Sequence, residues 1–255
     1  ALLVRSVAKV NHALIDQTKI KFVGSATIGT DHLDIPALEQ QNIAWSNAAG
    51  CNAQAVAEYV ITALLHLNID LLEKNKAFTL AIVGLGNVGK RLAVMAQFLG
   101  WNVIGYDPYV QLAGIENVSF QELLKQADAI SIHVPLTTSG DYPTLHLFDE
   151  AALAEMKPSA ILINSARGPV IQQSALMADI EKTKRQVVLD VFEFEPEIPQ
   201  ELLERLALAT PHIAGYSLEG KARGTQMIYE AFCHTFGYQP SKHFESQLPT
   251  VEQYF

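Results

Sequence analysis

Cysteine is scarce in this chain, with only Cys51 and Cys233 among 255 residues. The two lie far apart without metal-binding companions, so the sequence predicts neither a disulfide framework nor a metal site. Both are expected to be buried thiols. Cys51 precedes a predicted helix, as some reactive cysteines do, but we expect Asn52 to be the helix N-cap and Cys51 a packed neighbour.

Long apolar runs and positive charge are also lacking. No run reaches the ~18 uncharged residues that a membrane span needs, and no signal peptide is recognisable, so we expect a cytoplasmic protein without a membrane partner. Lys and Arg number 18 against 27 Asp and Glu, a formal net charge of −9. A broad nucleic-acid surface needs clustered basic residues. No nucleic-acid partner is therefore expected, although a local basic pocket is allowed.

The apolar residues that are present recur in an alternation of short runs and helical patterns. A globular α/β protein is expected, because 49% of the residues are hydrophobic and 18% are charged. Strands are predicted at 1–5, 21–25, 43–46, 80–83, 101–106, 129–134, 160–164, 187–191 and 206–209, and helices at 34–41, 52–72, 90–99, 120–127, 149–156 and 172–181. This alternation is typical of a doubly wound parallel sheet.

A glycine pattern follows the apolar run at 80–83. Gly84 permits a tight turn, Gly86 allows the backbone to approach a pyrophosphate, and Gly89 allows the helix to pack on the strand. Free amides and the positive end of the helix dipole would then face an anion. The pattern alone is weak, since glycine turns without a ligand are common. The strand before it and the helix after it make dinucleotide binding the favoured interpretation.

Asp107 stands at the end of the next predicted strand, 18 residues after Gly89. A carboxylate there can accept hydrogen bonds from a ribose 2′-hydroxyl and would repel a 2′-phosphate, which favours NAD over NADP. The alternative is an ordinary turn residue before Pro108. The expected domains are a smaller α/β substrate-binding domain at 1–72, a Rossmann-type NAD-binding domain at 73–218, and a C-terminal helix at 219–255 that returns to the substrate domain.

Polar residues follow several strands of the predicted sheet, where ligands of such sheets bind. Arg167 could hold a carboxylate bidentately and polarise a neighbouring carbonyl, although a lone arginine is commonly a surface ion-pair partner. His212 is suited to proton transfer near neutral pH. A carboxylate would orient its ring, and four glutamates are close enough in sequence to be candidates. They are Glu193, Glu195, Glu197 and Glu201, and spacing alone does not choose among them.

These motifs together resemble the D-isomer-specific 2-hydroxyacid dehydrogenases. The matching segments are the glycine pattern with Asp107, His133-Val134-Pro135-Leu136, Ala166-Arg167-Gly168, Leu189 to Pro196, and Pro211-His212-Ile213-Ala214-Gly215. The resemblance implies an NAD-dependent oxidoreductase with the catalytic residues Arg167, Glu195 and His212, which selects one of the four glutamates. It places Asp190 at the nicotinamide carboxamide. The cofactor contacts that it implies are Gly84, Gly86, Asn87, Val88, Gly89, Asp107, Val134, Ser165, Ala166, Arg167, Asp190 and Gly215.

Two further stretches narrow the resemblance to one branch of the family, which acts on a phosphorylated sugar acid. They are Val4 to Val7 with Gly24 to His32, and His212 to Gly224. This resemblance implies substrate contacts at Ser6, Thr27 and Tyr216. Hydroxyl groups with the nearby Arg5 and Lys9 suit a small phosphorylated substrate, although Ser6 and Thr27 could equally be turn residues.

The family pattern extends beyond both ends of this sequence. We expect a further strand and helix upstream of Ala1 and a dimerisation domain of which 241–255 would be the beginning, so the full-length protein is expected to be a homodimer. Two other functions stay open. One is another dehydrogenase of phosphorylated hydroxy acids, for example of 3-phosphoglycerate, against which Gly215-Tyr216 and the following Leu-Glu-Gly speak. The other is a non-catalytic NAD-sensing corepressor on the same fold.

Overall fold

The computed structural model describes residues 1–72, 77–244 and 248. The chain divides into two compact units, a smaller one of 1–53 with 216–255 and a larger one of 54–215. The divisions fall at 53/54 and 215/216, whereas the sequence predicted domain boundaries at 72/73 and 218/219. Each unit is described by itself.

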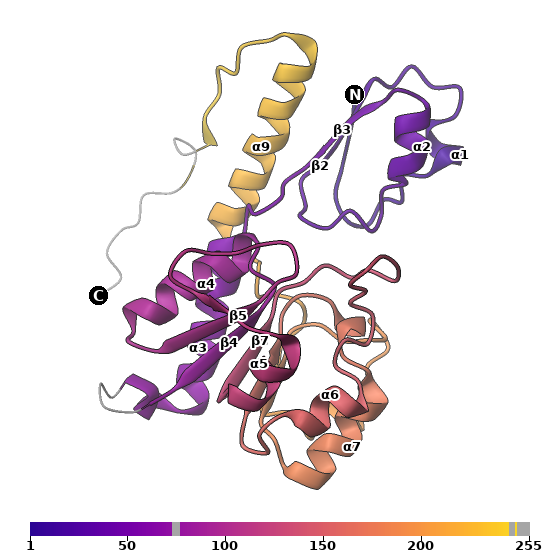
Figure 1. Cartoon of the computed structure of the whole chain (residues 1–255). Coiled ribbons are helices and arrows are strands. Elements are labelled where there is room, and N and C mark those ends of the chain that lie inside the picture. Colours follow the sequence, from indigo (N-terminus) through magenta and orange to yellow (C-terminus); the bar gives the residue numbers. More distant parts are fainter. Residues whose placement is uncertain (73–76, 245–247, 249–255) are drawn as a thin grey trace. The chain divides into compact units, whose positions relative to one another are not determined.

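The larger unit is built on a seven-stranded sheet in which every neighbouring pair is parallel (Figure 1). Its order is β10-β9-β8-β7-β4-β5-β6. The strands are β4 (Thr79–Val83), β5 (Asn102–Tyr106), β6 (Glu116–Asn117), β7 (Ala129–Ile132), β8 (Ile161–Asn164), β9 (Val187–Leu189) and β10 (Leu208–Ala209). The chain starts at β4 in the middle, adds strands on one side, and then returns to add the others. The predicted doubly wound parallel sheet is therefore confirmed, with its switch point between β4 and β7.

Helices cover both faces of this sheet. They are α3 (Ala53–Leu67), α4 (Asn87–Phe98), α5 (Phe120–Gln126), α6 (Glu150–Glu155), α7 (Gln173–Thr183) and α8 (Gln200–Leu203), with short 3₁₀ helices η1 (Ile69–Leu72) and η2 (Gly168–Val170). Side chains of β4 alternate between the two cores, as a buried strand requires. Leu80 and Ile82 pack with α3 and α4, whereas Ala81 and Val83 pack with α5, α6 and α7.

The helix before the glycine pattern differs from its prediction at both ends. It ends at Leu67 instead of Leu72, because the Asn68 side chain accepts a hydrogen bond from the Asp70 amide at 3.1 Å and starts the separate 3₁₀ turn. Asn52 is not a side-chain N-cap, since its Oδ1 is buried and has no hydrogen-bond partner in the described part of the chain. Cys51 is half-buried rather than fully buried, and Cys233 is buried.

The smaller unit is a three-layer α/β structure. Strands β1 (Leu2–Val4), β2 (Phe22–Ser25) and β3 (Ala44–Asn47) form a parallel sheet in the order β1-β2-β3. Helices α1 (His12–Ile15) and α2 (Ile35–Gln40) share one core with the sheet, and α9 (Leu218–Phe236) packs against β2 and β3. A Cβ on Gly24 would collide with Ile228 of α9, so this glycine lets the helix lie directly on the strand.

The chain beyond α9 is only partly described. Of the 241–255 segment, which the sequence assigned to a dimerisation region, 245–247 and 249–255 lie outside the described residues. Among the helices that are described, none is both long and apolar enough to cross a membrane.

Candidate active site

At two positions after β4, Gly84 and Gly89, neighbouring backbone atoms leave no room for a Cβ. Gly84 has φ +96°, and a Cβ there would lie 2.6 Å from the carbonyl oxygen of His133. A Cβ on Gly89 would collide with the carbonyl of Gly84. Gly86 differs, because a Cβ there would meet no atom of the described residues within 4 Å. The backbone at Gly86 is therefore open on its outer side.

This open backbone is also the start of a helix. Gly86 is the N-cap of α4, a helix of 12 residues, and makes no side-chain capping bond. The first amides of an α-helix have no partner within the helix, and they carry the positive end of the helix dipole. An anion such as a pyrophosphate fits this position.

The carboxylate of Asp107 lies beside this turn, at the end of β5. Its Oδ2 accepts a hydrogen bond from the Leu85 amide at 2.8 Å. Its Oδ1 accepts from the amides of Tyr109 at 2.9 Å and Val110 at 3.0 Å. Asp107 therefore serves as a turn residue, and it is also within reach of the glycine turn. Each carboxylate oxygen can accept more than one hydrogen bond, so the turn contacts leave acceptor capacity for a ribose.

The loop after β8 carries Arg167. The buried Asn164 side chain shapes this loop, since Oδ1 accepts from the Ala166 amide at 3.0 Å and Nδ2 donates to the Arg167 carbonyl at 2.9 Å. The Arg167 guanidinium donates to the Ala166 carbonyl at 2.8 Å. Ser165 adds an observation that favours a ligand, because its buried Oγ has no hydrogen-bond partner among the residues that the structure describes.

Gly168 explains why the loops after β8 and β9 lie side by side. A Cβ on Gly168 would collide with the Phe192 carbonyl, so only glycine fits there. The sequence identified Gly168 as part of a motif but gave no contact for it. The close approach brings the Arg167 loop next to the loop that carries Glu193 and Glu195.

His212 and Glu195 lie together in the structure. The Nδ1 of His212 is 3.1 Å from Oε2 of Glu195, and Oε1 of Glu195 accepts from the Phe192 amide at 2.7 Å. His212 is exposed, with 56% of its side chain accessible. The carboxylate is thus anchored by the backbone, and the imidazole is held through one nitrogen while its ring stays open to a ligand.

The other glutamates of the acidic segment have different partners. Glu193 Oε1 lies 2.6 Å from His146 Nε2, and Glu193 Oε2 accepts from the Gln173 amide at 2.7 Å. Glu201 forms an ion pair with Arg205 at 2.7 Å. Among the candidates, Glu195 is the carboxylate that the structure places on His212.

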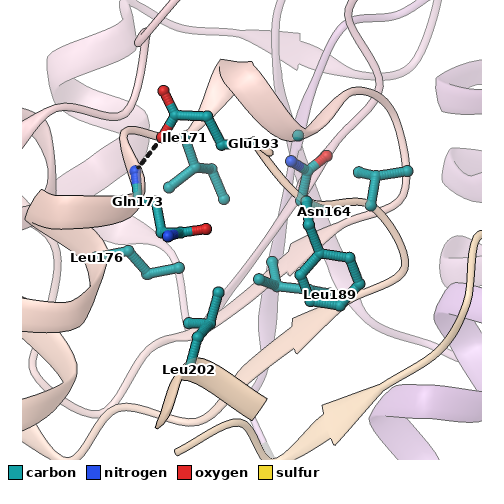
Figure 2. Close-up of a pocket in the computed structure, with 10 residues that line it drawn as sticks. Asn164, Ile171, Gln173, Leu176, Leu189, Glu193 and Leu202 are labelled. Atoms are coloured by element: carbon teal, nitrogen blue, oxygen red, sulfur yellow. Dashed lines mark hydrogen bonds between the residues drawn. The ribbon is translucent and has the colours of Figure 1, made fainter. Parts of the chain in front are cut away.

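A small cavity is lined by residues of the loops after β8 and β9 and of helices α7 and α8. Figure 2 shows Glu193 bonded to the Gln173 amide at its edge, with Ile171, Leu176, Leu189 and Leu202 around it. The surrounding side chains are mainly apolar, and the space is about that of a single water molecule. It is a packing gap rather than a substrate pocket.

Asp190 has contacts that the sequence did not predict. It is 1% exposed, and its carboxylate accepts from Thr210 Oγ1 at 2.6 Å and from the amides of Ile213 at 2.7 Å and Ala214 at 2.8 Å. The Asp190 carboxylate therefore holds the segment on both sides of His212, through the Thr210 side chain before it and two backbone amides after it. Its proposed contact with a nicotinamide carboxamide would come in addition to this internal role.

His133 begins the loop after β7, next to Val134. Its Nε2 lies 2.8 Å from Oγ of the fully buried Ser131. The residue keeps some contact with solvent, but burial of the imidazole lowers its pKa from 6.5 to about 3. His133 is therefore neutral at physiological pH.

The predicted substrate residues belong to the smaller unit. Val4 and Ser25 are paired in β1 and β2, so Ser6 and Thr27 follow neighbouring strands at the same edge. Thr27 Oγ1 lies 2.7 Å from Ser25 Oγ and donates to the Gly29 carbonyl at 3.2 Å. Ser25 Oγ is also 2.8 Å from His32 Nε2, a contact that sequence patterns did not indicate.

Tyr216 precedes α9 in this same unit. Its side chain is exposed, and the Lys221 ammonium lies 3.2 Å from the centroid of its ring. This is a cation–π contact at an exposed site.

Comparisons with known proteins agree with this geometry. Residues 67–214 match the family model described as D-isomer specific 2-hydroxyacid dehydrogenase, NAD binding domain. Over 255 residues, the whole chain is 72% identical to an erythronate-4-phosphate dehydrogenase of Acinetobacter baumannii (strain ACICU) and covers 72% of it.

Solved structures give the same result at lower identity. The TT0316 protein from Thermus thermophilus has a TM-score of 0.82 and 25% identity over 94% of this chain and 84% of that one. A D-lactate dehydrogenase from Aquifex aeolicus, complexed with NAD and lactic acid, has a TM-score of 0.76 and 25% identity over 92% and 82%. The chain therefore belongs to the family of NAD-dependent D-isomer specific 2-hydroxyacid dehydrogenases, and residues 67–214 carry its NAD-binding domain.

Proposed function

We propose that this protein oxidises 4-phospho-D-erythronate at C2 to 3-hydroxy-2-oxo-4-phosphobutanoate, a step of pyridoxine (vitamin B6) biosynthesis, with NAD as the hydride acceptor. The 72% identity to an erythronate-4-phosphate dehydrogenase over the whole chain supports this substrate. The observation that carries the chemistry is the His212–Glu195 pair on the NAD-binding unit. An exposed imidazole held by a fixed carboxylate is the arrangement that removes a proton from a hydroxyl group.

Proton transfer follows from how the pair is held. With Glu195 accepting the Nδ1 proton, the neutral ring presents its unprotonated Nε2. This nitrogen takes the C2 hydroxyl proton as the C2 hydride leaves and the carbonyl forms. The resulting imidazolium is stabilised by the Glu195 charge, which the Phe192 amide keeps in place.

Arg167 is proposed to bind the substrate carboxylate. Its planar guanidinium can form two parallel hydrogen bonds to a carboxylate and can polarise the neighbouring C2 oxygen. The Asn164 side chain and the tight approach at Gly168 support this placement, because they fix the loop on which the guanidinium stands.

The cofactor-holding residues fit NAD. The open turn at Gly86 with the amides of Asn87, Val88 and Gly89 suits the pyrophosphate, and Asp107 suits the adenosine ribose. The other residues proposed to contact NAD are Val134 after β7, Ser165 and Ala166 after β8, Asp190 after β9, and Gly215, the last residue of the larger unit. NAD supplies the nicotinamide ring that accepts the hydride.

Substrate selectivity is proposed to reside in the smaller unit. Ser6 and Thr27 offer hydroxyl groups after neighbouring strands, and Tyr216 stands at the start of α9 with Lys221 over its ring. The exposed Arg5 and Lys9 add positive charge to the segment that contains Ser6. Hydroxyls and cations together suit a phosphate better than an apolar side chain.

The direct test is NAD reduction followed with 4-phospho-D-erythronate, 3-phosphoglycerate and D-lactate. We expect turnover with the first and a much lower kcat/KM with the other two. Preference for 3-phosphoglycerate would assign the chain to that other substrate. Tight NAD binding without hydride transfer to any hydroxy acid would favour the corepressor.

We also propose that the full-length protein is a homodimer. Val94 and Phe98 lie one helical turn apart on α4 and are 62% and 92% exposed. An exposed apolar pair of this kind suits contact with a second copy of the chain. Light scattering of the full-length protein should give a dimer for the wild type and for Val7→Glu, and a monomer for Phe98→Glu. The cytoplasmic location stays a prediction.

A further inference from the structure

A single buried carboxylate holds the loop that carries His212. Asp190 Oδ1 accepts from both the Thr210 hydroxyl and the Ile213 amide, and Oδ2 accepts from the Ala214 amide. The His212 amide also donates to the Asp190 carbonyl at 2.8 Å and to the Thr210 carbonyl at 3.0 Å. The backbone on each side of the imidazole is therefore tied to one residue at the end of β9.

His212 needs such support because of its backbone conformation. Its φ is +57°, in the left-handed region that residues other than glycine seldom occupy. A residue holds such a conformation where its surroundings impose it. The direction of the His212 ring thus depends on the bonds that converge on Asp190.

The hydrogen bonds at Thr210 have a defined direction. Its hydroxyl has one proton, which it donates to Asp190 at 2.6 Å. At the 2.7 Å contact between Tyr59 and Thr210, the phenol must therefore be the donor. The chain of donors runs from Tyr59 to Thr210 to Asp190. Burial raises the pKa of Tyr59, which keeps the phenol protonated and able to donate.

Tyr59 reaches this loop from a different part of the larger unit. It lies on α3, whose neighbouring residues Val60 and Leu64 are fully buried in the core, while the phenol oxygen points at Thr210. Helix α3 is anchored in the core, and it therefore holds the Tyr59 hydroxyl against the loop that carries His212. The sequence pattern predicted only that Tyr59 lies within the helix at 52–72.

We propose that Tyr59 is a positioning residue for His212, acting through Thr210 and Asp190. The phenol orients the Thr210 hydroxyl, the hydroxyl completes the donors around the Asp190 carboxylate, and the carboxylate fixes the backbone that aims the imidazole. The inference rests on the proposed function in one respect, which is that His212 acts as the catalytic base.

The test combines Tyr59→Phe, Thr210→Val and Thr210→Ser in the otherwise unchanged protein. We expect kcat with 4-phospho-D-erythronate to fall about 3- to 10-fold in Tyr59→Phe, which loses a neutral hydrogen bond. In Thr210→Val it should fall about 10- to 100-fold, since a charged acceptor loses a donor. The KM for the substrate should stay within about twofold, because neither side chain is proposed to touch it, and kcat is measured at saturating NAD because Asp190 is also a proposed NAD contact. Thr210→Ser keeps the hydroxyl and should restore most of the rate.

Deuterium uptake of the peptide that spans 210–216 supplies a readout independent of the substrate. It should rise in Tyr59→Phe and Thr210→Val, and remain at the wild-type level in Thr210→Ser. Tyr229→Phe is the matched control, because it also loses one hydrogen bond of a tyrosine hydroxyl, in this case the one that Tyr229 accepts from the Ser241 amide on the smaller unit. Neither kcat nor the 210–216 uptake should change in that variant.

The outcomes separate the two proposals. Faster local exchange with a lower kcat supports the positioning role. Faster local exchange in a protein that does not oxidise phosphoerythronate at all would reject the substrate and retain the positioning of the loop. Unchanged exchange at 210–216 in Tyr59→Phe, or an increase spread evenly over the larger unit, would overturn the inference. Tyr59→Phe keeps the test decisive if Thr210→Val does not fold.

Discussion

The Nδ1 atom of His212 lies 3.1 Å from Oε2 of Glu195, while the other oxygen of that carboxylate accepts from the Phe192 amide. This arrangement divides the carboxylate between two tasks. One oxygen fixes the side chain to the backbone, and the other fixes the ring that would accept the proton. The proposed roles of Glu195 and His212 therefore both depend on the short segment after β9, which carries Glu195 and Phe192.

Replacing either member of the pair should reduce turnover. We expect His212→Asn to lower kcat at least about 100-fold, since a general base contributes roughly 10²–10⁴-fold. Glu195→Gln should have a smaller effect, because the ring keeps a hydrogen-bond partner but the imidazolium loses its counter-charge. Steady-state NAD reduction measures both.

Glu193→Gln is the matched control for this pair, since Glu193 stands two residues away and contacts His146 instead. It should keep kcat within a few-fold of the wild type. An equal loss of kcat in Glu193→Gln and Glu195→Gln would contradict the assignment of Glu195.

Asp107 should determine which dinucleotide is used. In Asp107→Ser the negative charge is lost, so kcat/KM for NAD should fall about 10- to 100-fold with the loss of a charged hydrogen bond. Activity with NADP should rise relative to NAD, because the 2′-phosphate is no longer repelled. Initial rates with both cofactors give the ratio.

Asp107→Ser should also cost some stability, because the carboxylate accepts amides of the turn. Asp128→Ser controls for this effect. Asp128 accepts the Thr79 amide at 2.9 Å and pairs with Lys157, contacts at the start of β4 rather than at its end. It should lower stability and leave the cofactor ratio unchanged, and a shift of that ratio would show that the effect is not specific to Asp107.

The sequence predicted the sheet because parallel strands buried on both faces leave a strong signal. Continuous apolar runs such as 80–83 and 161–163 marked the strands, and the glycine spacing marked the turn between β4 and α4. Helix ends were less predictable. The side chain of Asn68 competes for a backbone amide, and this local choice separates α3 from η1.

Contacts between distant segments could not be obtained from spacing. Residue types placed Arg167 and His212 at strand ends, but four glutamates were equivalent until the resemblance selected one. The link from Tyr59 to Thr210 joins residues 151 positions apart, and Gly168 is needed only because Phe192 passes beside it. Such relationships depend on packing across the sheet, for which one sequence has no periodic signal.

A buried ion pair should contribute to the stability of the larger unit. Arg185 is 3% exposed, with Nε 2.6 Å from Oδ2 of Asp179 and a donor to the Lys157 carbonyl at 2.6 Å. Arg185→Met strands the buried carboxylate, so the free energy of unfolding should fall by about 3–5 kcal/mol. Urea unfolding followed by circular dichroism measures the change.

Two further variants test the cause of that loss. Arg185→Met combined with Asp179→Leu should recover much of the stability, because the uncompensated charge is removed. Arg205→Met breaks the exposed pairs with Glu181 and Glu201 and should cost less than about 1 kcal/mol. A double variant no more stable than Arg185→Met would contradict the stranded-charge explanation.

Acid should destabilise the protein in part through His133. Its pKa is about 3 in the folded protein and 6.5 ordinarily, so below pH 6.5 the unfolded chain binds a proton that the folded one does not. Stability from this group is therefore present above pH 6.5 and is lost as the pH falls, by at most about 1.4 kcal/mol per pH unit. Urea unfolding at pH 7.5 and 5.5 measures the dependence.

His133→Asn isolates this contribution, because asparagine retains a polar partner for Ser131 but does not titrate. The wild type should lose up to about 1.4 kcal/mol more than His133→Asn between pH 7.5 and 5.5. Burial also lowers the pKa of His32, and the Asp31 charge partly offsets this shift. His32 makes the free energy of unfolding depend on pH in the same way in both proteins, so its effect cancels in the comparison. If the free energy of unfolding changed equally with pH in the two proteins, the His133 ring would accept its proton without unfolding, contrary to this prediction.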